Sequence, residues 1–317
     1  MRVVVALGGN AMTGPDGRAR VEDQVAAARV AMESVADLVR DRVEVVITHG
    51  NGPQVGNLLV KNELAASVVP PVPLDWCGAS TQATLGFVMM NALEAALTRR
   101  GAEARPATVV TRTRVDPDDP GFTTPAKPIG RYLPREEAAK LVDHGETWQD
   151  RGEKGWRRVV ASPEPLEILD APAVVALVDA GFVVVANGGG GLPVVSEDGG
   201  WRGVEAVIDK DLGAALLART VHADVLVIAT DVDHAVLHFG TPDEQPLGRV
   251  TAPQLRAYAG EGHFASGSMG PKVEAACRFV EAGGRYAVIT GLDSIVAAVA
   301  GETGTVVVPE HEGGPHA

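Results

Sequence analysis

Three apolar, β-branched segments of this chain each end abruptly in glycine, and this repeated pattern constrains the fold more than any other feature. The segments read RVVVAL at residues 2–7, VEVVIT at 43–48 and FVVVA at 182–186. The runs that follow them shortly afterwards are Gly8-Gly9-Asn10, Gly50-Asn51-Gly52 and Gly188-Gly189-Gly190-Gly191. Because the carboxyl ends of parallel strands share one edge of a sheet, where ligands bind, we expect the three runs to lie together.

The four consecutive glycines at 188–191 have two interpretations. Taken alone, they are equally consistent with a flexible surface turn and with a nest of backbone N–H groups that holds an anion. The recurrence of the pattern after two other strands favours the anion-facing loop. The sequence contains no Walker A pattern and no convincing dinucleotide-binding GxGxxG, which disfavours Walker-type ATPases and Rossmann dehydrogenases.

Composition narrows the class of protein. Aromatic residues make up only 4% of the 317 residues, so the core must consist of Val, Ala, Leu and Ile, which favours an α/β fold. The net charge of −13 makes nucleic acid a poor partner, and it requires a local cationic site to draw in any anionic substrate. Two distant cysteines, no signal peptide and no apolar stretch of about 18 residues predict a cytoplasmic protein without a membrane partner.

Helical and strand patterns alternate along most of the chain, which predicts parallel strands joined by right-handed crossovers. Residues ~112–165 interrupt this alternation with repeated prolines and charges, and we expect them to form a small lobe that stands off the main sheet. Helices are expected at 21–40, 53–68, 76–99, 173–180, 209–220, 252–259, 271–282 and 293–300. Further strands are expected at 107–111, 203–208, 225–230, 286–290 and, as an edge strand, 305–308. The expected helix caps are Asp170, Thr251 and Asp293.

Three lysines occupy unusual positions. Lys272 follows a Gly/Ser-rich loop and is expected at the second position of a helix opened by Pro271, where the helix dipole disfavours a cation. Lys210 begins another expected helix, and Lys127 lies between prolines in the inserted lobe. Each could be a solvated surface lysine. Together with the glycine runs, however, they supply the cations and amides that stabilise phosphoryl transfer.

Two carboxylates accompany these lysines. Asp211 follows Lys210 directly and could orient the lysines, while Asp209 precedes it and could help to hold Mg²⁺. The sequence shows no Ser-His-Asp signature and no zinc-ligand spacing, and its eight histidines are scattered. The residues themselves therefore favour phosphoryl transfer without a nucleophilic side chain.

Eight motifs carry a resemblance to a known family. They read LGGNA at 7–11, HGNGPQVG at 49–56, AKPIG at 126–130, GWRRVVASPEP at 155–165, NGGGGLPV at 187–194, GVEAVIDKDLGAALLA at 203–218, TDVD at 230–233 and FASGSMGPKVEAA at 264–276. In this order, over nearly the whole chain, they resemble carbamate kinase, a branch of the amino acid kinase superfamily. The resemblance implies a three-layer αβα sandwich on a mostly parallel eight-stranded sheet, a small protruding subdomain and a homodimer.

The resemblance also implies an activity. The expected reaction is ATP + carbamate ⇌ ADP + carbamoyl phosphate, with Mg²⁺ carried by the nucleotide phosphates and no metal ligand firmly assigned. Residues 1–202 would form the acceptor half of one αβα domain, including the subdomain at ~112–165, and residues 203–317 the nucleotide-binding half. The enzyme would run toward ATP, as in arginine breakdown.

Site residues follow from the matched motifs. Lys127, Lys210 and Lys272 resemble the lysines that stabilise the transferring phosphate, and Asp211 resembles their organiser. The acceptor and phosphate cradle would be Gly8, Gly9, Asn10, Gly50, Asn51 and Gly52, closed by Gly188, Gly189, Gly190 and Gly191. The nucleotide side would include Asp209, Asp231, Ser268, Met269 and Gly270.

The sequence also departs from related patterns. Acetylglutamate, glutamate and uridylate kinases carry a first-strand lysine that is missing here, as in the carbamate branch. His234, Ala235, Leu237 and His238 differ from the residues usual in carbamate kinases on the adenine side. Two alternative functions remain: a related kinase for another small carboxylate, and a non-catalytic member of the fold that binds a nucleotide or an oxyanion.

Overall fold

A central sheet organises the fold. The computed structural model describes residues 1–13, 19–142, 145–264 and 268–310, and within these residues the sheet has eight strands. Neighbouring strands pair in parallel except β16 and β17, which pair antiparallel. The predicted mostly parallel sheet is confirmed. From edge to edge the order is β15 (Arg249–Thr251), β17 (Thr305–Val308), β16 (Tyr286–Gly291), β12 (Val225–Thr230), β1 (Arg2–Leu7), β2 (Glu44–His49), β9 (Phe182–Val185) and β3 (Arg105–Thr108).

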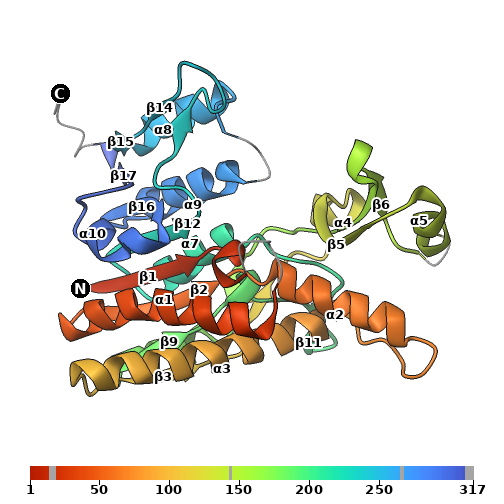
Figure 1. Cartoon of the computed structure of the whole chain (residues 1–317), viewed down its shortest axis with the longest axis horizontal. Coiled ribbons are helices and arrows are strands. Elements are labelled where there is room, and N and C mark those ends of the chain that lie inside the picture. The colour runs from red at the N-terminus through yellow and green to blue at the C-terminus, as the bar shows by residue number, and fades with distance from the viewer. Residues whose placement is uncertain (14–18, 143–144, 265–267, 311–317) are drawn as a thin grey trace.

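Helices cover both faces of this sheet, which confirms the three-layer sandwich (Figure 1). One layer consists of α1 (Val21–Arg40), α3 (Leu74–Arg100) and α10 (Ile295–Val299). The other consists of α6 (Ala171–Asp179), α7 (Lys210–Thr220), α8 (Ala252–Gly260) and α9 (Met269–Glu281). In the part of the chain that the structure describes, no helix is both long and apolar enough to cross a membrane.

Burial on both faces explains the continuous apolar runs in the sequence. In β1, Val3, Val5 and Leu7 pack into the core under α1 and α3, whereas Val4 and Ala6 pack into the core on the other face. None of the five is more than 2% exposed. A strand covered by helices on both sides has no position that favours a polar residue, so its sequence is an uninterrupted run of apolar residues.

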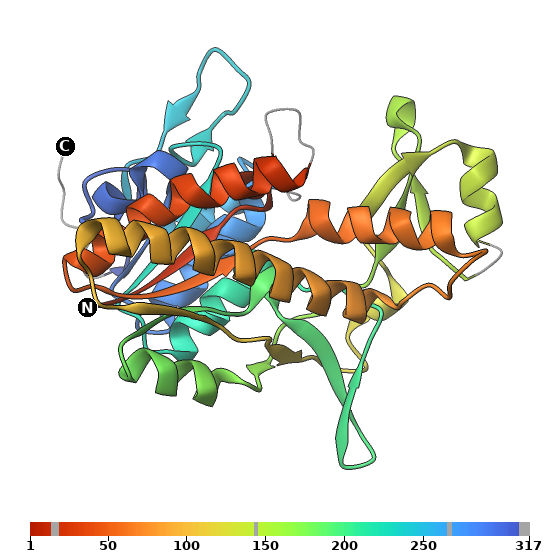
Figure 2. The same cartoon turned by 60° about the horizontal axis from the view of Figure 1, so that its bottom comes forward.

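A small lobe stands off the sandwich beside α2 (Gly52–Ala65) (Figure 2). Its strands β5 (Lys127–Leu133), β7 (Trp156–Val160) and β6 (Trp148–Asp150) form a three-stranded antiparallel sheet, with α5 (Arg135–Val142) packed on it. Ile129 and Val160 of the lobe pack against Val55 and Leu59 of α2. We call residues 127–160 the lobe and the remainder the body.

The lobe is smaller than the predicted 112–165 insertion. β4 (Arg112–Arg114) and β8 (Glu167–Ile168) flank it in sequence but belong to the body. There they join β10 (Leu192–Glu197) and β11 (Gly200–Gly203) in a four-stranded sheet. The short α4 (Pro120–Thr123) and the 3₁₀ turn η2 (Gly152–Lys154) complete this region.

Three strand predictions need correction. The expected strand at 203–208 is instead a connection that contributes one isolated bridge, because its apolar residues pack into small side clusters. β17 is not an edge strand, since the three-residue β15 covers it. The strand expected at 107–111 begins and ends earlier, at 105–108. The two-residue strands β13 (Val236–Leu237) and β14 (Gln245–Pro246) pair with each other.

The predicted helix ends had mixed outcomes. Thr251 forms a complete capping box with Gln254, as expected of a capping residue. Asp170 stands at the predicted N-cap, but its carboxylate binds Arg112 and makes no cap hydrogen bond. Asp293 does not cap a helix, because it lies inside the 3₁₀ turn η4 (Leu292–Ser294). Helix α9 begins at Met269, so Lys272 is its fourth residue and not its second.

Candidate active site

The first two glycine runs touch each other at the carboxyl ends of β1 and β2. Gly50 N donates to Leu7 O at 2.9 Å, which holds the two strand ends in register. A Cβ on Gly50 would lie 2.7 Å from Gly9 N and 2.9 Å from Lys210 Cδ. Only glycine fits here, because any side chain would push the first run and Lys210 away.

Gly188–Gly191 is a packed segment. It is buried, and its first three residues form the 3₁₀ turn η3 (Gly188–Gly190). A Cβ on Gly188 would lie 2.4 Å from His49 Nε2, and one on Gly189 would lie 2.4 Å from Asn51 Nδ2. Gly189, Gly190 and Gly191 have φ values of 67°, 88° and 90°, which favour glycine. A flexible surface turn is therefore wrong, and the anion-facing role stays a prediction.

Lys210 and Lys272 share one buried carboxylate. Lys210 Nζ lies 2.6 Å from Asp211 Oδ1, and Lys272 Nζ lies 3.1 Å from Asp211 Oδ2. Asp211 is 3% exposed. Burial raises the pKa of its carboxyl, but the charges and hydrogen bonds of the two lysines outweigh it and hold the pKa below its usual value. The first turns of α7 and α9 are thereby joined through an ionised carboxylate, and the catalytic role of Asp211 as organiser of the lysines stays a prediction.

Lys127 reaches the same region from the lobe. Its Nζ lies 2.7 Å from Asp209 Oδ2. Asp209 caps α7, because its Oδ1 accepts from Asp211 N at 2.9 Å and from Leu212 N at 3.4 Å. Three lysines from β5, α7 and α9 thus meet two carboxylates, those of Asp209 and Asp211, and the formal charges of the five side chains leave one positive charge in excess.

Two clefts open beside this cluster. The first cleft has a volume of about 680 Å³ and lies between the lobe and the body; its walls include Asn51, Gly52, Gly188, Gly189 and Gly191. The second cleft has a volume of about 670 Å³ and is lined by Gly8, Gly9, Lys210 and Lys272. Residues of the first glycine run, together with Lys210 and Lys272, thus line the second cleft, and residues of the other two runs line the first. The contact between Gly9 and Gly50 shows that the two clefts are neighbours.

Most of the residues predicted for the nucleotide side line the second cleft. Asp231, Ser268 and Met269 do so, and Asp231 also accepts a hydrogen bond from Thr230 at 2.9 Å. Gly270 is the next residue of α9 but is not among the lining residues, and Asp209 is engaged by Lys127 instead. Residues 265–267 of the predicted phosphate loop lie outside the described residues. Asn10 belongs by its backbone to η1 (Gly9–Met12).

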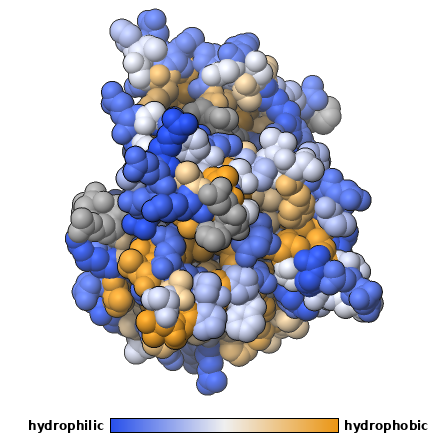
Figure 3. Space-filling model, turned by 90° about the vertical axis from the view of Figure 1, so that its right-hand side faces the viewer, coloured by the Kyte–Doolittle hydropathy of each residue, from blue (hydrophilic) through white to orange (hydrophobic). Residues whose placement is uncertain are grey.

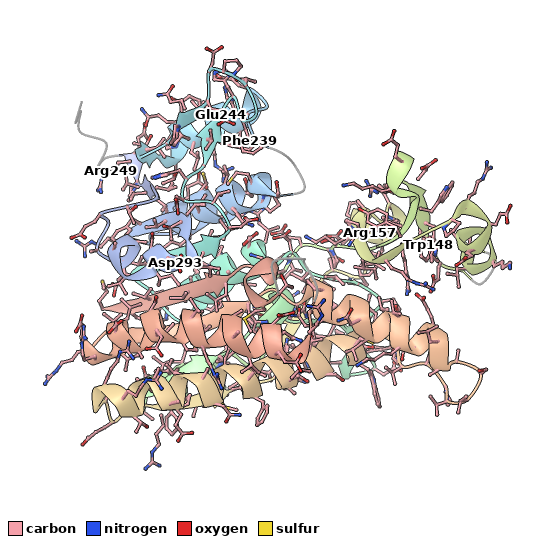
Figure 4. The ribbon with its side chains drawn as sticks, viewed as in Figure 1. Trp148, Arg157, Phe239, Glu244, Arg249 and Asp293 are labelled. Carbon is pink, nitrogen blue, oxygen red and sulfur yellow. The ribbon has the colours of Figure 1, made fainter. Side chains whose placement is uncertain are left out.

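Sequence reasoning missed Phe239, His263 and Phe264 of the second cleft. Together with His234, which the sequence had marked on the adenine side, they give the cleft a largely aromatic wall, and Phe239 (labelled in Figure 4) is 74% exposed. Two signals could have found them. Aromatic residues are scarce in this chain, and the segment from 234 to 238 already stood out as a departure from the family pattern.

His49 was also missed, although it is the last residue of β2 and directly precedes the second glycine run. Burial lowers its pKa to about 4, a hydrogen bond from the ring to Gly50 O opposes this shift, and the charge of Lys210 adds to it. The ring is therefore neutral at neutral pH. Because a carbonyl oxygen only accepts, His49 Nδ1 must donate the 3.0 Å hydrogen bond to Gly50 O, which fixes the carbonyl inside the glycine run.

Comparison with known proteins identifies the family. The sequence model of the amino acid kinase family matches residues 1–291. A carbamate kinase from Thermococcus kodakarensis is 49% identical over 313 residues, which cover 98% of this chain and 99% of that protein. The chain belongs to the amino acid kinase family, in its carbamate kinase branch.

Solved structures agree with this assignment. A carbamate kinase from Giardia lamblia bound to AMP-PNP superposes with a TM-score of 0.92 at 40% identity, over 98% of each chain. A second structure of the Giardia enzyme, thiocarbamoylated by disulfiram on a cysteine, has a TM-score of 0.90 at 38% identity and covers 98% of this chain and 99% of its own. This chain therefore shares the fold of carbamate kinases along its whole length, lobe included.

The neutral state of His49 predicts a pH-dependent stability. Because its folded pKa of about 4 lies below the ordinary 6.5, the unfolded chain binds more protons, so this histidine lowers stability as pH falls from about 6.5 to 4. The loss is on the order of 3 kcal/mol. His49→Gln should flatten the difference in unfolding free energy between pH 7 and pH 4.5, as measured by urea denaturation. His222→Asn, at an exposed histidine, is the control; an unchanged slope in His49→Gln would contradict the assignment.

The cysteines should be inert toward disulfiram. The sequence has two, Cys77 and Cys277, and both are 0% exposed. Burial raises the pKa of both thiols, that of Cys277 to about 12, so little thiolate forms. Intact mass spectrometry should show no adduct on the native protein and two reactive thiols in urea. One adduct on the folded chain would refute this expectation.

Proposed function

We propose that this chain catalyses Mg²⁺-dependent, reversible phosphoryl transfer between ATP and carbamate, giving ADP and carbamoyl phosphate. The observation that carries the proposal is the convergence of Lys127, Lys210 and Lys272 beside two contacting glycine runs, within a fold shared with carbamate kinases. Residues 1–202 would bind the acceptor and residues 203–317 the nucleotide. The central sheet takes four strands from each of these halves.

The chemistry needs little from the protein beyond position and charge. In the transition state negative charge spreads over the transferring phosphoryl group, and fixed cations and amides stabilise it. Lys210 and Lys272 would supply two such cations, oriented by Asp211 before the substrates arrive. Gly8, Gly9, Asn10 and the run at 50–52 would cradle the oxygens with backbone amides, with 188–191 closing the acceptor side. Lys127 would join when the lobe lies against the body.

Magnesium fits this site as an ion held mainly by the nucleotide. The described residues include no group of three or more histidine, cysteine or acidic side chains placed to hold a metal ion. Mg²⁺ commonly binds one or two protein carboxylates together with substrate phosphates. Asp209, at the start of α7, is the candidate protein contact. When bound, the ion would neutralise charge on the nucleotide phosphates.

The direction of the reaction follows from its energetics. Carbamoyl phosphate is a mixed anhydride and a better phosphoryl donor than ATP, so we propose that the enzyme makes ATP, as in the breakdown of arginine. Two free, buried cysteines are consistent with action in the reducing cytoplasm.

We further propose that the enzyme is a homodimer. From residue 76 to residue 93, α3 carries no charged side chain, although Trp76 is 64% and Phe87 59% exposed. Exposed apolar residues continue along the connection between α2 and α3, and hydrophobic patches lie among polar residues on the lower part of the face in Figure 3. Copies that each carry a charge of −13 repel, so association requires an uncharged surface.

Sedimentation should give twice the chain mass of 32.9 kDa.

A coupled assay tests the activity. ATP should form from ADP and carbamoyl phosphate in the presence of Mg²⁺, and chelation with EDTA should stop it. Turnover on acetylglutamate or another carboxylate, without turnover on carbamoyl phosphate, would favour the related kinase. Nucleotide binding without turnover on any of these substrates would favour a non-catalytic member.

Lys210 and Lys272, the two lysines that contact Asp211, should be required for a normal kcat. Lys210→Ala or Lys272→Ala should lower kcat by about 10²–10³-fold, because each removes a fixed cation from the transition state. Lys140→Ala, at an exposed position of α5, is the matched control and should retain kcat. Circular dichroism and ADP titration would verify that the variants fold. A near-normal kcat in either variant would remove that lysine from the mechanism.

A further inference from the structure

The side of the lobe that faces the body is cationic. Four basic side chains from β5 and β7 lie there: Lys127, Arg131, Arg157 and Arg158. Three of them are held by carboxylates of the body across the boundary. These pairs are Lys127–Asp209 at 2.7 Å, Arg131–Glu63 at 3.0 Å and Arg158–Glu205 at 3.5 Å.

Arg157 (labelled in Figure 4) differs from the other three. Within the described part of the chain no carboxylate forms an ion pair with it. Its Nε donates to Gly130 O at 3.2 Å, and its Nη1 donates to the Tyr132 hydroxyl at 3.4 Å. The guanidinium carbon lies 5.0 Å from the centroid of the Tyr132 ring. A guanidinium has five N–H groups, so most of its donors remain available although its position is fixed.

Those donors belong to a wall of the first cleft. Arg157, Gly130 and Arg131 line it on the lobe side, and Gly52 and Gly56, from the first turns of α2, line it on the body side. The two walls approach closely at one point, where a Cβ on Gly56 would lie 3.5 Å from Gly130 Cα. The cleft is thus a formed space with an oriented cation.

The described residues of the cleft favour an anion. Among those that line it, Asp75 supplies the one carboxylate, whereas Arg20, Arg131 and Arg157 supply three guanidinium groups. The chain as a whole carries a charge of −13, which repels an anionic substrate from most of the surface. The charges of Arg131 and Arg20 are partly neutralised by ion pairs with Glu63 and Asp23. Arg157 is therefore the cation of this wall that is best placed to attract a further anion.

We propose that Arg157 forms a recruiting subsite for the dianionic acyl phosphate, carbamoyl phosphate, at the lobe side of the first cleft. This inference rests on the proposed function and extends it. Tyr132 keeps the guanidinium extended toward the cleft, and a phosphate group accepts from its open edge in the bidentate manner that arginine provides. The substrate is captured here before the lysines act on it. ADP, which enters the second cleft, does not depend on Arg157.

Arg157→Gln tests this subsite in the direction of ATP synthesis. The KM for carbamoyl phosphate should rise about 10- to 100-fold, the range expected for one charge-assisted contact, while the KM for ADP stays unchanged. The dependence of kcat/KM on ionic strength should also weaken, because the recruiting charge is gone. Arg157→Lys keeps a charge without the planar fork and should show a smaller increase.

Arg151→Gln is the matched control. Arg151 precedes the turn η2 of the same lobe, is exposed and does not line the first cleft. Its variant removes the same charge from the lobe and should change no KM more than about twofold. If Arg157→Gln and Arg157→Lys both match Arg151→Gln, the subsite is refuted.

Calorimetry with inorganic phosphate separates this inference from the proposed function. The probe should bind the unmodified protein more tightly than it binds Arg157→Gln, in the absence of nucleotide. If the protein does not turn over carbamoyl phosphate but this difference holds, the proposed function fails and an anion subsite stands. If turnover is normal and the two proteins bind phosphate equally, the subsite alone fails.

Discussion

The buried carboxylate of Asp211 is the interaction on which the rest of the site depends. It is nearly inaccessible to water, yet it stays ionised because Lys210 and Lys272 surround it. An ionised carboxylate without partners at this depth would carry a large desolvation cost, so the lysines and the aspartate require one another. The same contact joins the first turn of α7 to that of α9. The positions of two cations are therefore set by the folding of α7 and α9 themselves.

The lobe is attached to this centre by electrostatics as much as by packing. Its apolar contact with α2 is small, and one part of it is an approach between Gly56 and Gly130. The cross-boundary ion pairs are partly exposed, and such pairs individually contribute little free energy. A lobe held in this way is positioned without being locked. Lys127 is therefore attached to Asp209 by an ion pair that contributes little free energy of its own.

Much of the fold could be predicted from the sequence. Burial on both faces of a parallel sheet requires long β-branched runs, and the glycines after these runs show where the strands end. Lys210 and Lys272 could be singled out because a cation near a helix start is locally unfavourable, whereas Lys127 gained its meaning from the glycine runs and from the family motif around it. Other features are set by tertiary contacts. The place of β17 inside the sheet depends on the three-residue β15, and the strand expected at 203–208 is replaced by packing into side clusters. The protonation of His49 and the contacts of Arg157 with Gly130 and Tyr132 depend on neighbours that no local pattern encodes.

The four glycines at 188–191 are explained by close packing on both sides of the run. On one side, side chains here would meet His49 and Asn51, which belong to the end of β2 and the second glycine run. On the other, a Cβ on Gly190 would lie 2.8 Å from Ile208 Cγ2, just before α7 begins. The first three glycines thus act as a thin spacer between the glycine run at 50–52 and the start of the helix that carries Lys210. A Cβ on Gly191 would lie 1.9 Å from Thr113 Oγ1, so tight packing by itself demands glycine at all four positions.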